Sequence, residues 1–165
     1  MIQYYESIFY NTLEELLATW KPNHPDVLRL KAKYGEGIQF SNLNKILDEL
    51  FVAKGWQRQA PVFSSEEAAY AKMDFLKDRI GVEVQFGHAS FIGIDLLKMQ
   101  IASYSNLDNI DFGVYIVTTN KMQKYLKSNY RLKWDGSLSY EKVIKYLPHI
   151  KSAIQVPIYV IGIDI

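Results

Sequence analysis

The sequence contains no cysteine among its 165 residues, which excludes disulfide bonds, thiol nucleophiles and cysteine-ligated zinc sites. It also lacks a long apolar run. The longest, PIYVIGI near the C-terminus, is far shorter than the roughly 20 residues that span a bilayer. The first ten residues, MIQYYESIFY, lack the basic and apolar regions of a signal peptide. We therefore expect a soluble, cytoplasmic protein with no contact to a membrane.

Neither sign of charge dominates the composition. The 19 lysines and arginines nearly balance the 18 aspartates and glutamates, so the formal net charge is +1. A surface for nucleic acid would therefore have to be local. Hydrophobic residues make up 48% of the chain and charged residues 22%, which supports a sizeable core and excludes global disorder. The length favours a single domain over residues 1–165.

The order of apolar and polar residues predicts helices alternating with strands. Apolar spacings of three and four residues indicate helices over 8–20, 25–34, 41–54, 90–104, 121–127 and 137–150. Extended segments are expected over 56–63, 73–86, 109–119 and 156–165. Residues 64–72 form either a capped helix or a loop, and Gly55 is expected to end the helix before it. This alternation favours an α/β fold with a mixed sheet flanked by helices.

Two segments after residue 89 are expected to pack into the core. The strand predicted over 109–119, NIDFGVYIVTT, is mostly apolar, which is typical of a strand buried on both faces. The helix predicted over 90–104 has an apolar stripe made of Phe91, Ile94, Leu97 and Ile101. Asp95 and Lys98 lie off that stripe, so we expect both to face solvent.

Residues 73–87, MDFLKDRIGVEVQFG, predict a β-hairpin with two different faces. We place Asp78 and Arg79 at the centre of its turn. One face then collects Met73, Phe75, Ile80, Val82, Val84 and Phe86. The pair Asp-Arg is not a favoured type I′ turn, so a longer loop with a shifted register is the alternative.

The other face of this hairpin brings two carboxyl groups together. Asp74 lies opposite Glu83 in the two-residue-turn register, and Gln85 shares their face. Two such neighbours repel unless a cation lies between them, and Mg²⁺ needs only one or two protein carboxylates. A metal there can activate a water beside a phosphate, and an amide can position it. The alternative is an exposed face, with its acids solvated or paired with Lys72 or Lys77.

The same three residues match a known pattern. Asp74, then Glu83 nine positions later, then Gln85 after one more residue resembles the active site of the PD-(D/E)XK nucleases, with Gln85 in place of their usual lysine. With the surrounding FLKDRIGVEVQFG, it resembles the BglII/BstYI family of type II restriction endonucleases. The resemblance extends over residues 43–119. Two departures are the absence of the usual proline, since Met73 precedes the aspartate, and a chain shorter than those of the family.

The resemblance implies a fold, a reaction and roles for particular residues. The fold is the PD-(D/E)XK restriction-endonuclease-like mixed sheet flanked by helices. Asp74 and Glu83 would bind Mg²⁺ or another divalent cation, with the main-chain carbonyl of Val84 as a third ligand. Gln85 would help to position the attacking water. Enzymes of this family act as homodimers on palindromic double-stranded DNA and cut each strand once, here at a site that contains a GATC core by analogy.

Two further segments are candidates for reading DNA. The resemblance places a DNA-reading loop at GHAS, where His88 and Ser90 can donate and accept hydrogen bonds at base edges. The alternative is that Ser90 caps the next helix and His88 is solvated. The second segment, TTNK, comprises Thr118, Thr119, Asn120 and Lys121. Its polar side chains suit base contacts, and the alternative is an N-cap at Asn120.

A run of basic residues follows the second segment. Residues 120–134 contain no acidic residue and five basic ones, namely Lys121, Lys124, Lys127, Arg131 and Lys133. Contacts between these side chains and phosphates would make DNA binding depend steeply on salt. The alternative is an ordinary solvated surface.

We therefore interpret the sequence as a Mg²⁺-dependent, sequence-specific DNA endonuclease of the restriction type, acting as a homodimer. Two alternatives stay open. One is a structure-selective nuclease for repair or junction resolution, with the same metal site and no base selectivity. The other is a DNA-binding module on a catalytically inactive nuclease fold, which the replacement of lysine by Gln85 allows.

Overall fold

The computed structural model describes residues 40–63, 71–104, 109–131 and 136–164. The chain forms two compact units, residues 1–56 and 57–165. Every predicted site residue belongs to the second unit, and one nuclease domain over the whole chain stays a prediction. The helices predicted over 8–20 and 25–34 lie outside the described residues, as do residues 64–70.

The described part of the first unit contains helix α3, Phe40–Ala53, which confirms the helix predicted there. Gly55 follows it with φ +80°, a left-handed conformation that glycine adopts without a steric cost. Its N–H donates to the carbonyl of Val52 at 2.9 Å. Trp56 then meets Phe51 edge to face, with the ring centroids 5.2 Å apart. The helix therefore ends where the sequence indicates.

The second unit is built on one mixed sheet of five strands in the order β1-β2-β3-β4-β5. The strands are β1 Gln57–Pro61, β2 Lys72–Lys77, β3 Ile80–Val84, β4 Phe112–Thr118 and β5 Ile158–Ile163. The pairs β1–β2 and β2–β3 are antiparallel, whereas β3–β4 and β4–β5 are parallel. The predicted α/β fold with a mixed sheet is confirmed.

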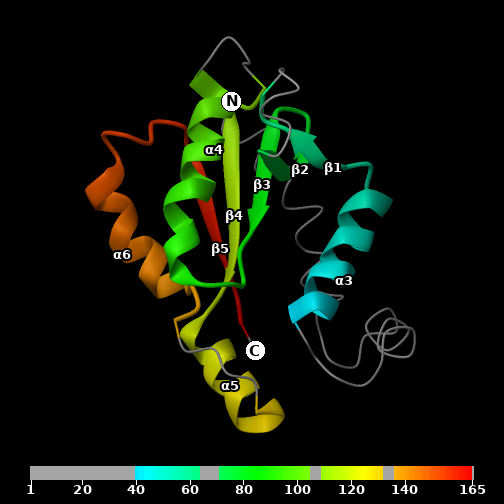
Figure 1. Ribbon diagram of the computed structural model, residues 1–165, viewed down its shortest axis with the longest axis vertical. Helices are drawn as coiled ribbons and strands as arrows, with labels where there is room; N and C mark the ends of the chain where they lie inside the picture. The colour runs from blue at the N-terminus through cyan, green and yellow to red at the C-terminus, as the bar shows by residue number, and fades with distance from the viewer. Residues whose placement is uncertain (1–39, 64–70, 105–108, 132–135, 165) are drawn as a thin grey trace. The chain divides into compact units, whose positions relative to one another are not determined.

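Helical segments connect the parallel strands. They are η2 Ala89–Phe91, α4 Ile92–Tyr104, α5 Asn120–Tyr130 and α6 Tyr140–Ile150. Helices α4 and α6 lie on the same side of the sheet in Figure 1. Each contributes buried residues to a core with β4, the strand buried along its whole length. None of the helices that the structure describes is long and apolar enough to cross a membrane.

The hairpin turn has the predicted two-residue form. Lys77 pairs with Ile80, and the turn residues Asp78 and Arg79 have φ +47° and +65°. Positive φ at both positions matches a type I′ turn, which neither residue favours by itself. Arg79 donates from Nε and Nη2 to the two carboxylate oxygens of Asp111, both at 2.7 Å, and its carbonyl accepts from the N–H of Asp111 at 2.8 Å. These hydrogen bonds between Arg79 and Asp111 offset the conformational cost of the turn.

The solvent-facing side predicted for α4 was wrong. Asp95 is 4% exposed, and Lys98 donates to buried Glu83, so both point toward the sheet. Three of the predicted inner residues are instead on the surface, with Phe91 50%, Ile94 60% and Leu97 50% exposed, whereas the fourth, Ile101, is half-buried against the core. A second apolar stripe, formed by Leu96, Met99 and Ala102, fills the core. Because α4 is apolar on both sides, spacing alone could not select the buried one.

Two glycines test how α4 packs on β4. A Cβ at Gly113 would lie 2.7 Å from Sδ of Met99, whereas a Cβ at Gly93 would meet nothing within 4 Å. We expect Gly113→Ala to lower the free energy of unfolding by about 1–3 kcal/mol through overpacking. Gly93→Ala should raise it by about 0.5–1 kcal/mol, because alanine favours the helix. Urea titrations followed by circular dichroism measure both, and equal effects would contradict this packing.

Candidate metal-binding site at the end of the hairpin

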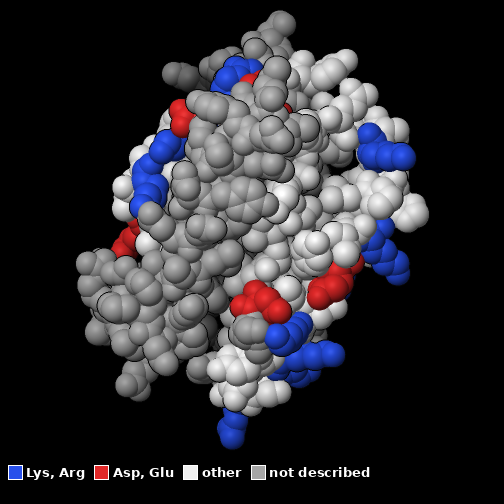
Figure 2. Space-filling model, turned by 180° about the vertical axis from the view of Figure 1, so that it is seen from behind, with Lys and Arg blue, Asp and Glu red and all other residues white. Residues whose placement is uncertain are grey.

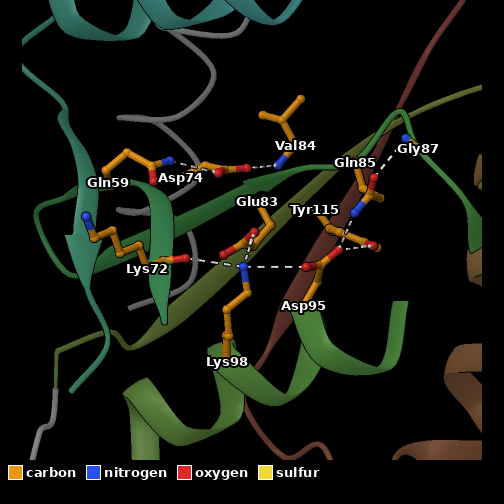
Figure 3. A network of polar contacts seen from close by, with 10 residues as sticks. All are labelled: Gln59, Lys72, Asp74, Glu83, Val84, Gln85, Gly87, Asp95, Lys98 and Tyr115. Carbon is orange, nitrogen blue, oxygen red and sulfur yellow. Dashed lines mark hydrogen bonds and ion pairs between the residues drawn. The ribbon is translucent and has the colours of Figure 1, made fainter. Parts of the chain in front are cut away.

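Where the pairing of β2 with β3 ends, the side chain of Asp74 accepts a hydrogen bond from the main chain of β3. The paired positions run from Lys77–Ile80 to Phe75–Val82. Beyond them, Oδ2 of Asp74 accepts a hydrogen bond from the N–H of Val84 at 2.9 Å. Its Oδ1 accepts from Nε2 of Gln59 at 3.3 Å (Figure 3). The predicted register is confirmed, and the aspartate carboxylate is tied to the end of β3.

Gln59 is a contact that the sequence did not reveal. It lies on β1 between Arg58 and Ala60, which pair with β2, and it has φ +51°. A non-glycine residue in this left-handed region carries a conformational cost of about 1 kcal/mol or more. This conformation accompanies the hydrogen bond from its amide to Asp74. No residue type in QRQAP marks the special backbone, so spacing could not have found it.

Glu83 is buried, with only 3% of its surface exposed. Its Oε2 accepts from Nζ of Lys98 at 2.7 Å. The lysine paired with it therefore comes from α4, and not from β2 as the exposed-face alternative had it. The other oxygen, Oε1, is buried, and the described part of the chain offers it no hydrogen-bond partner. An acceptor left in this way is a candidate ligand for a cation.

Gln85 is held at both ends of its amide. Its Nε2 donates to Oδ2 of Asp95 at 3.0 Å, and its Oε1 accepts from the N–H of Gly87 at 2.8 Å. The hydroxyl of Tyr115 donates to the same Oδ2 of Asp95 at 2.9 Å. Tyr115 is the β4 partner of Glu83, so the network ties β3 and β4 to α4 (Figure 3). Asp95 is a second site residue that the sequence missed, because it was assigned to solvent.

Burial and proximity of like charges perturb the titration of this cluster. Burial raises the pKa of Asp74. Burial, followed by the nearby charge of Asp74, raises the pKa of Glu83 from 4.5 to about 8. For Lys98, burial alone would lower the pKa, but Glu83 and the neighbouring acids raise it on balance. The charged carboxylates are therefore costly here, and a bound cation would offset that cost.

The donor set fits a hard divalent ion. Asp74 and Glu83 provide carboxylate oxygens, the ligands that Mg²⁺ and Ca²⁺ prefer. Within the described ranges, no three His, Asp or Glu side chains gather closely enough to hold an ion by themselves. Mg²⁺ does not need three, since it keeps several waters and takes substrate phosphate oxygens. Two acids with one orphaned buried oxygen are consistent with such a site.

The loop after Gln85 carries the first pair of predicted DNA contacts. His88 and Ser90 are both exposed. The alternative role of Ser90 as the cap is wrong for η2, because His88 is the capping residue there: its Nδ1 accepts from the N–H of Ser90 at 3.2 Å. The loop is braced by residues 136–138, with hydrogen bonds of 2.8 Å from Ala89 N–H to Gly136 and 2.9 Å from Leu138 N–H to Gly87.

The segment after β4 holds the second group. Thr118 is fully buried, and its hydroxyl accepts from Nε2 of Gln123 at 2.9 Å. Thr119 is the N-cap of α5, with its hydroxyl accepting from the N–H of Met122. The cap predicted at Asn120 was therefore one residue late, because Asn120 is the first helical residue, and it is exposed.

Basic side chains project from α5 and its C-cap. The exposed ones are Lys121, Lys124, Lys127 and Arg131. Figure 2 shows blue side chains gathered at the end of the second unit that carries this helix. Lys121 also forms an ion pair of 3.4 Å with Asp164, and Lys133 lies outside the described residues. The predicted local basic surface is present over α5.

Comparisons with known proteins agree with this architecture. A family model described as restriction endonuclease BglII/BglIII matches residues 9–163. The crystal structure of restriction endonuclease BglII complexed with a DNA 16-mer superposes with a TM-score of 0.63 at 19% identity. That match covers 77% of this chain and 56% of the other, so this chain spans little more than half of its length. No curated protein sequence matches. The predicted restriction-endonuclease-like fold is confirmed.

The raised pKa of Glu83 predicts how stability depends on pH. Between its unfolded value of 4.5 and its folded value of about 8, the folded protein retains a proton that the unfolded chain has lost. Stability therefore falls as the pH rises through this window, by on the order of 3 kcal/mol in metal-free buffer. Glu83→Gln should show a flatter profile. Thermal melts in EDTA at stepped pH measure this, and parallel profiles for the two proteins would contradict it.

Proposed function

The chain belongs to the BglII/BglIII restriction endonuclease family, and from this membership we propose that it is a sequence-specific endonuclease of double-stranded DNA. It would hydrolyse one phosphodiester bond in each strand of a short palindromic site, acting as a homodimer with a divalent cation. The observation that carries the proposal is the convergence of Asp74, Glu83 and Gln85 where β2 begins and β3 ends.

The residues of the site have separate tasks in this proposal. Asp74 and Glu83 bind Mg²⁺ or another divalent cation, with the main-chain carbonyl of Val84 as a third ligand. A bound Mg²⁺ would supply acidity to a water and stabilise negative charge on the phosphate. The orphaned Oε1 of Glu83 supports this assignment, because it is buried and can accept.

Gln85 positions the attacking water in this proposal. An amide nitrogen carries two N–H donors, and one of them is taken by Asp95. The second is available for a water or a phosphate oxygen. An amide cannot act as a general base, so Gln85 would orient the water and not deprotonate it. In-line attack on phosphorus would break the bond to the 3′ oxygen and leave 5′-phosphate and 3′-hydroxyl ends.

Recognition of bases is proposed for the loops after β3 and β4. Exposed His88 and Ser90 would read base edges from the first, and Asn120 from the second. Lys121 and Lys124 would contact phosphates. The burial of Thr118 and the capping role of Thr119 support a structural contribution from these two residues. A GATC core in the target is proposed from the family alone.

One alternative has a specific observation in its favour. Gln85 carries no charge, and Glu83 is already paired with Lys98. A DNA-binding module without cleavage would have the same fold and the same basic helix. A structure-selective nuclease would differ only in its lack of base selectivity.

Cleavage of unmethylated plasmid DNA distinguishes these functions. With Mg²⁺ the protein should give discrete bands, and with EDTA none. Asp74→Asn should lower the cleavage rate by about 10³-fold or more, because the metal contributes several kcal/mol to the transition state. Asp78→Asn is the matched control, since Asp78 lies on the turn of the same hairpin and outside the site.

Each result separates one function from the others. Discrete bands require base recognition, whereas cleavage confined to branched DNA would indicate a structure-selective nuclease. Tight binding without Mg²⁺-dependent cutting would indicate the inactive module. Equal rates for Asp74→Asn and the unaltered protein would remove Asp74 from the site.

The DNA contacts are tested by binding with the cleavage-deficient Asp74→Asn protein. Lys124→Ala should weaken binding to all sequences and reduce the slope of log affinity against log salt by about 1. Asn120→Ala should cost about 1–3 kcal/mol on the target and relax base preference at one position. Lys145→Ala on α6 is the control for loss of one exposed lysine. Fluorescence anisotropy over a salt series measures all three, and an unchanged slope for Lys124→Ala would exclude a phosphate contact.

A further inference from the structure

Lys98 reaches from α4 into the cluster of acids and makes two hydrogen bonds and a further ion pair there. Its Nζ lies 2.7 Å from Oε2 of Glu83 and 3.4 Å from Oδ1 of Asp95. It also donates to the carbonyl of Lys72 on β2 at 3.2 Å. Figure 3 shows the ammonium between these three acceptors. Two hydrogen bonds and an ion pair therefore hold the ammonium among these groups.

The positive charge of Lys98 offsets part of the negative charge that collects beside the sheet. Asp74, Glu83 and Asp95 place three carboxyl groups in one partly buried region, and the residue at the end of β3 that contacts them, Gln85, is uncharged. Lys98 lowers the pKa of both Asp74 and Glu83, against their burial. Its side chain is only 20% exposed, so solvent screens these interactions weakly.

The two oxygens of Glu83 are divided between different partners. Oε2 is taken by Lys98, while Oε1 is buried with no hydrogen-bond partner in the described part of the chain. A carboxylate anchored by one oxygen presents the other in a fixed direction. Because Lys98 occupies Oε2, Oε1 is the oxygen of Glu83 that is left to accept from a further group.

We propose that Lys98 is a positioning residue of the metal site: its ammonium supplies from α4 the counter-charge that holds Asp74 and Glu83 in place before an ion binds. This inference rests on the proposed function of these acids as metal ligands. Lys98 and a divalent ion would offset the same negative charge. Removal of the lysine should therefore make the stability of the fold depend on the ion.

The experiment compares melting temperatures at about pH 8.5 in EDTA and in excess Ca²⁺, without DNA. Lys98→Met keeps the length of the side chain and removes its charge. In EDTA it should melt about 5–10 °C below the unaltered protein, because a buried charge pair has been broken. Ca²⁺ should then raise its melting temperature by about 3–6 °C more than it raises that of the unaltered protein.

Two further variants separate charge from packing. Lys98→Arg keeps the positive charge and should recover more than half of the loss in EDTA. Lys145→Met removes an exposed lysine from α6 and should match the unaltered protein in both buffers. If Ca²⁺ stabilises Lys98→Met no more than the unaltered protein, the role of Lys98 is packing alone and the inference is overturned. A melting temperature unchanged in EDTA would overturn it as well.

A double variant covers the case in which Lys98→Met does not fold. Replacing Glu83 by Gln in the same chain removes the uncompensated charge, so the double variant should fold and melt above Lys98→Met. Failure of both to fold would place the contribution of Lys98 in packing and overturn the inference. The plasmid digest is independent of these melts: absence of cutting with an enlarged Ca²⁺ effect would sink the proposed function alone.

Discussion

The structure depends on a concentration of carboxyl groups where the antiparallel part of the sheet meets the parallel part. Asp74 comes from the antiparallel hairpin, while Glu83 lies on β3, which is also the first parallel strand. Burial makes their charges costly, and the charge of Asp74 makes Glu83 more difficult to ionise. A stable fold does not need this arrangement. Two acids kept together at such a cost are typical of a functional site.

The surrounding elements are arranged to hold these acids. Val84 and Gln59 bind the two oxygens of Asp74 from either side of β2. Helix α4 packs over the sheet and contributes Asp95 and Lys98, which connect Glu83 and Gln85 in one network. The same helix leaves an apolar stripe on its outer side, so its polar inner positions are set by the site and not by the general rule for surface helices.

The sequence alone was enough to predict those features for which a local pattern of residues allows one structure. The register of the hairpin follows from alternation and turn length, and the burial of β4 follows from its apolar run. The orientation of α4 could not be predicted, because it depends on Glu83 reaching Lys98 across 15 residues of sequence. The left-handed backbone conformation of Gln59 could not be predicted from the sequence either. Contacts between elements decide both, and no periodicity within one element encodes them.

The replacement of the usual lysine by Gln85 gains a physical explanation from the same contacts. With an amide at Gln85, directly after β3, this segment places no cation beside Asp74 and Glu83. In the proposed arrangement, Lys98 restores one positive charge from a different element, on the side of Glu83 away from its orphaned oxygen. The charge balance of a site can therefore be kept while the sequence motif changes. A nuclease motif should accordingly be judged by the charges that meet in space, including those on the helix that packs against the strand.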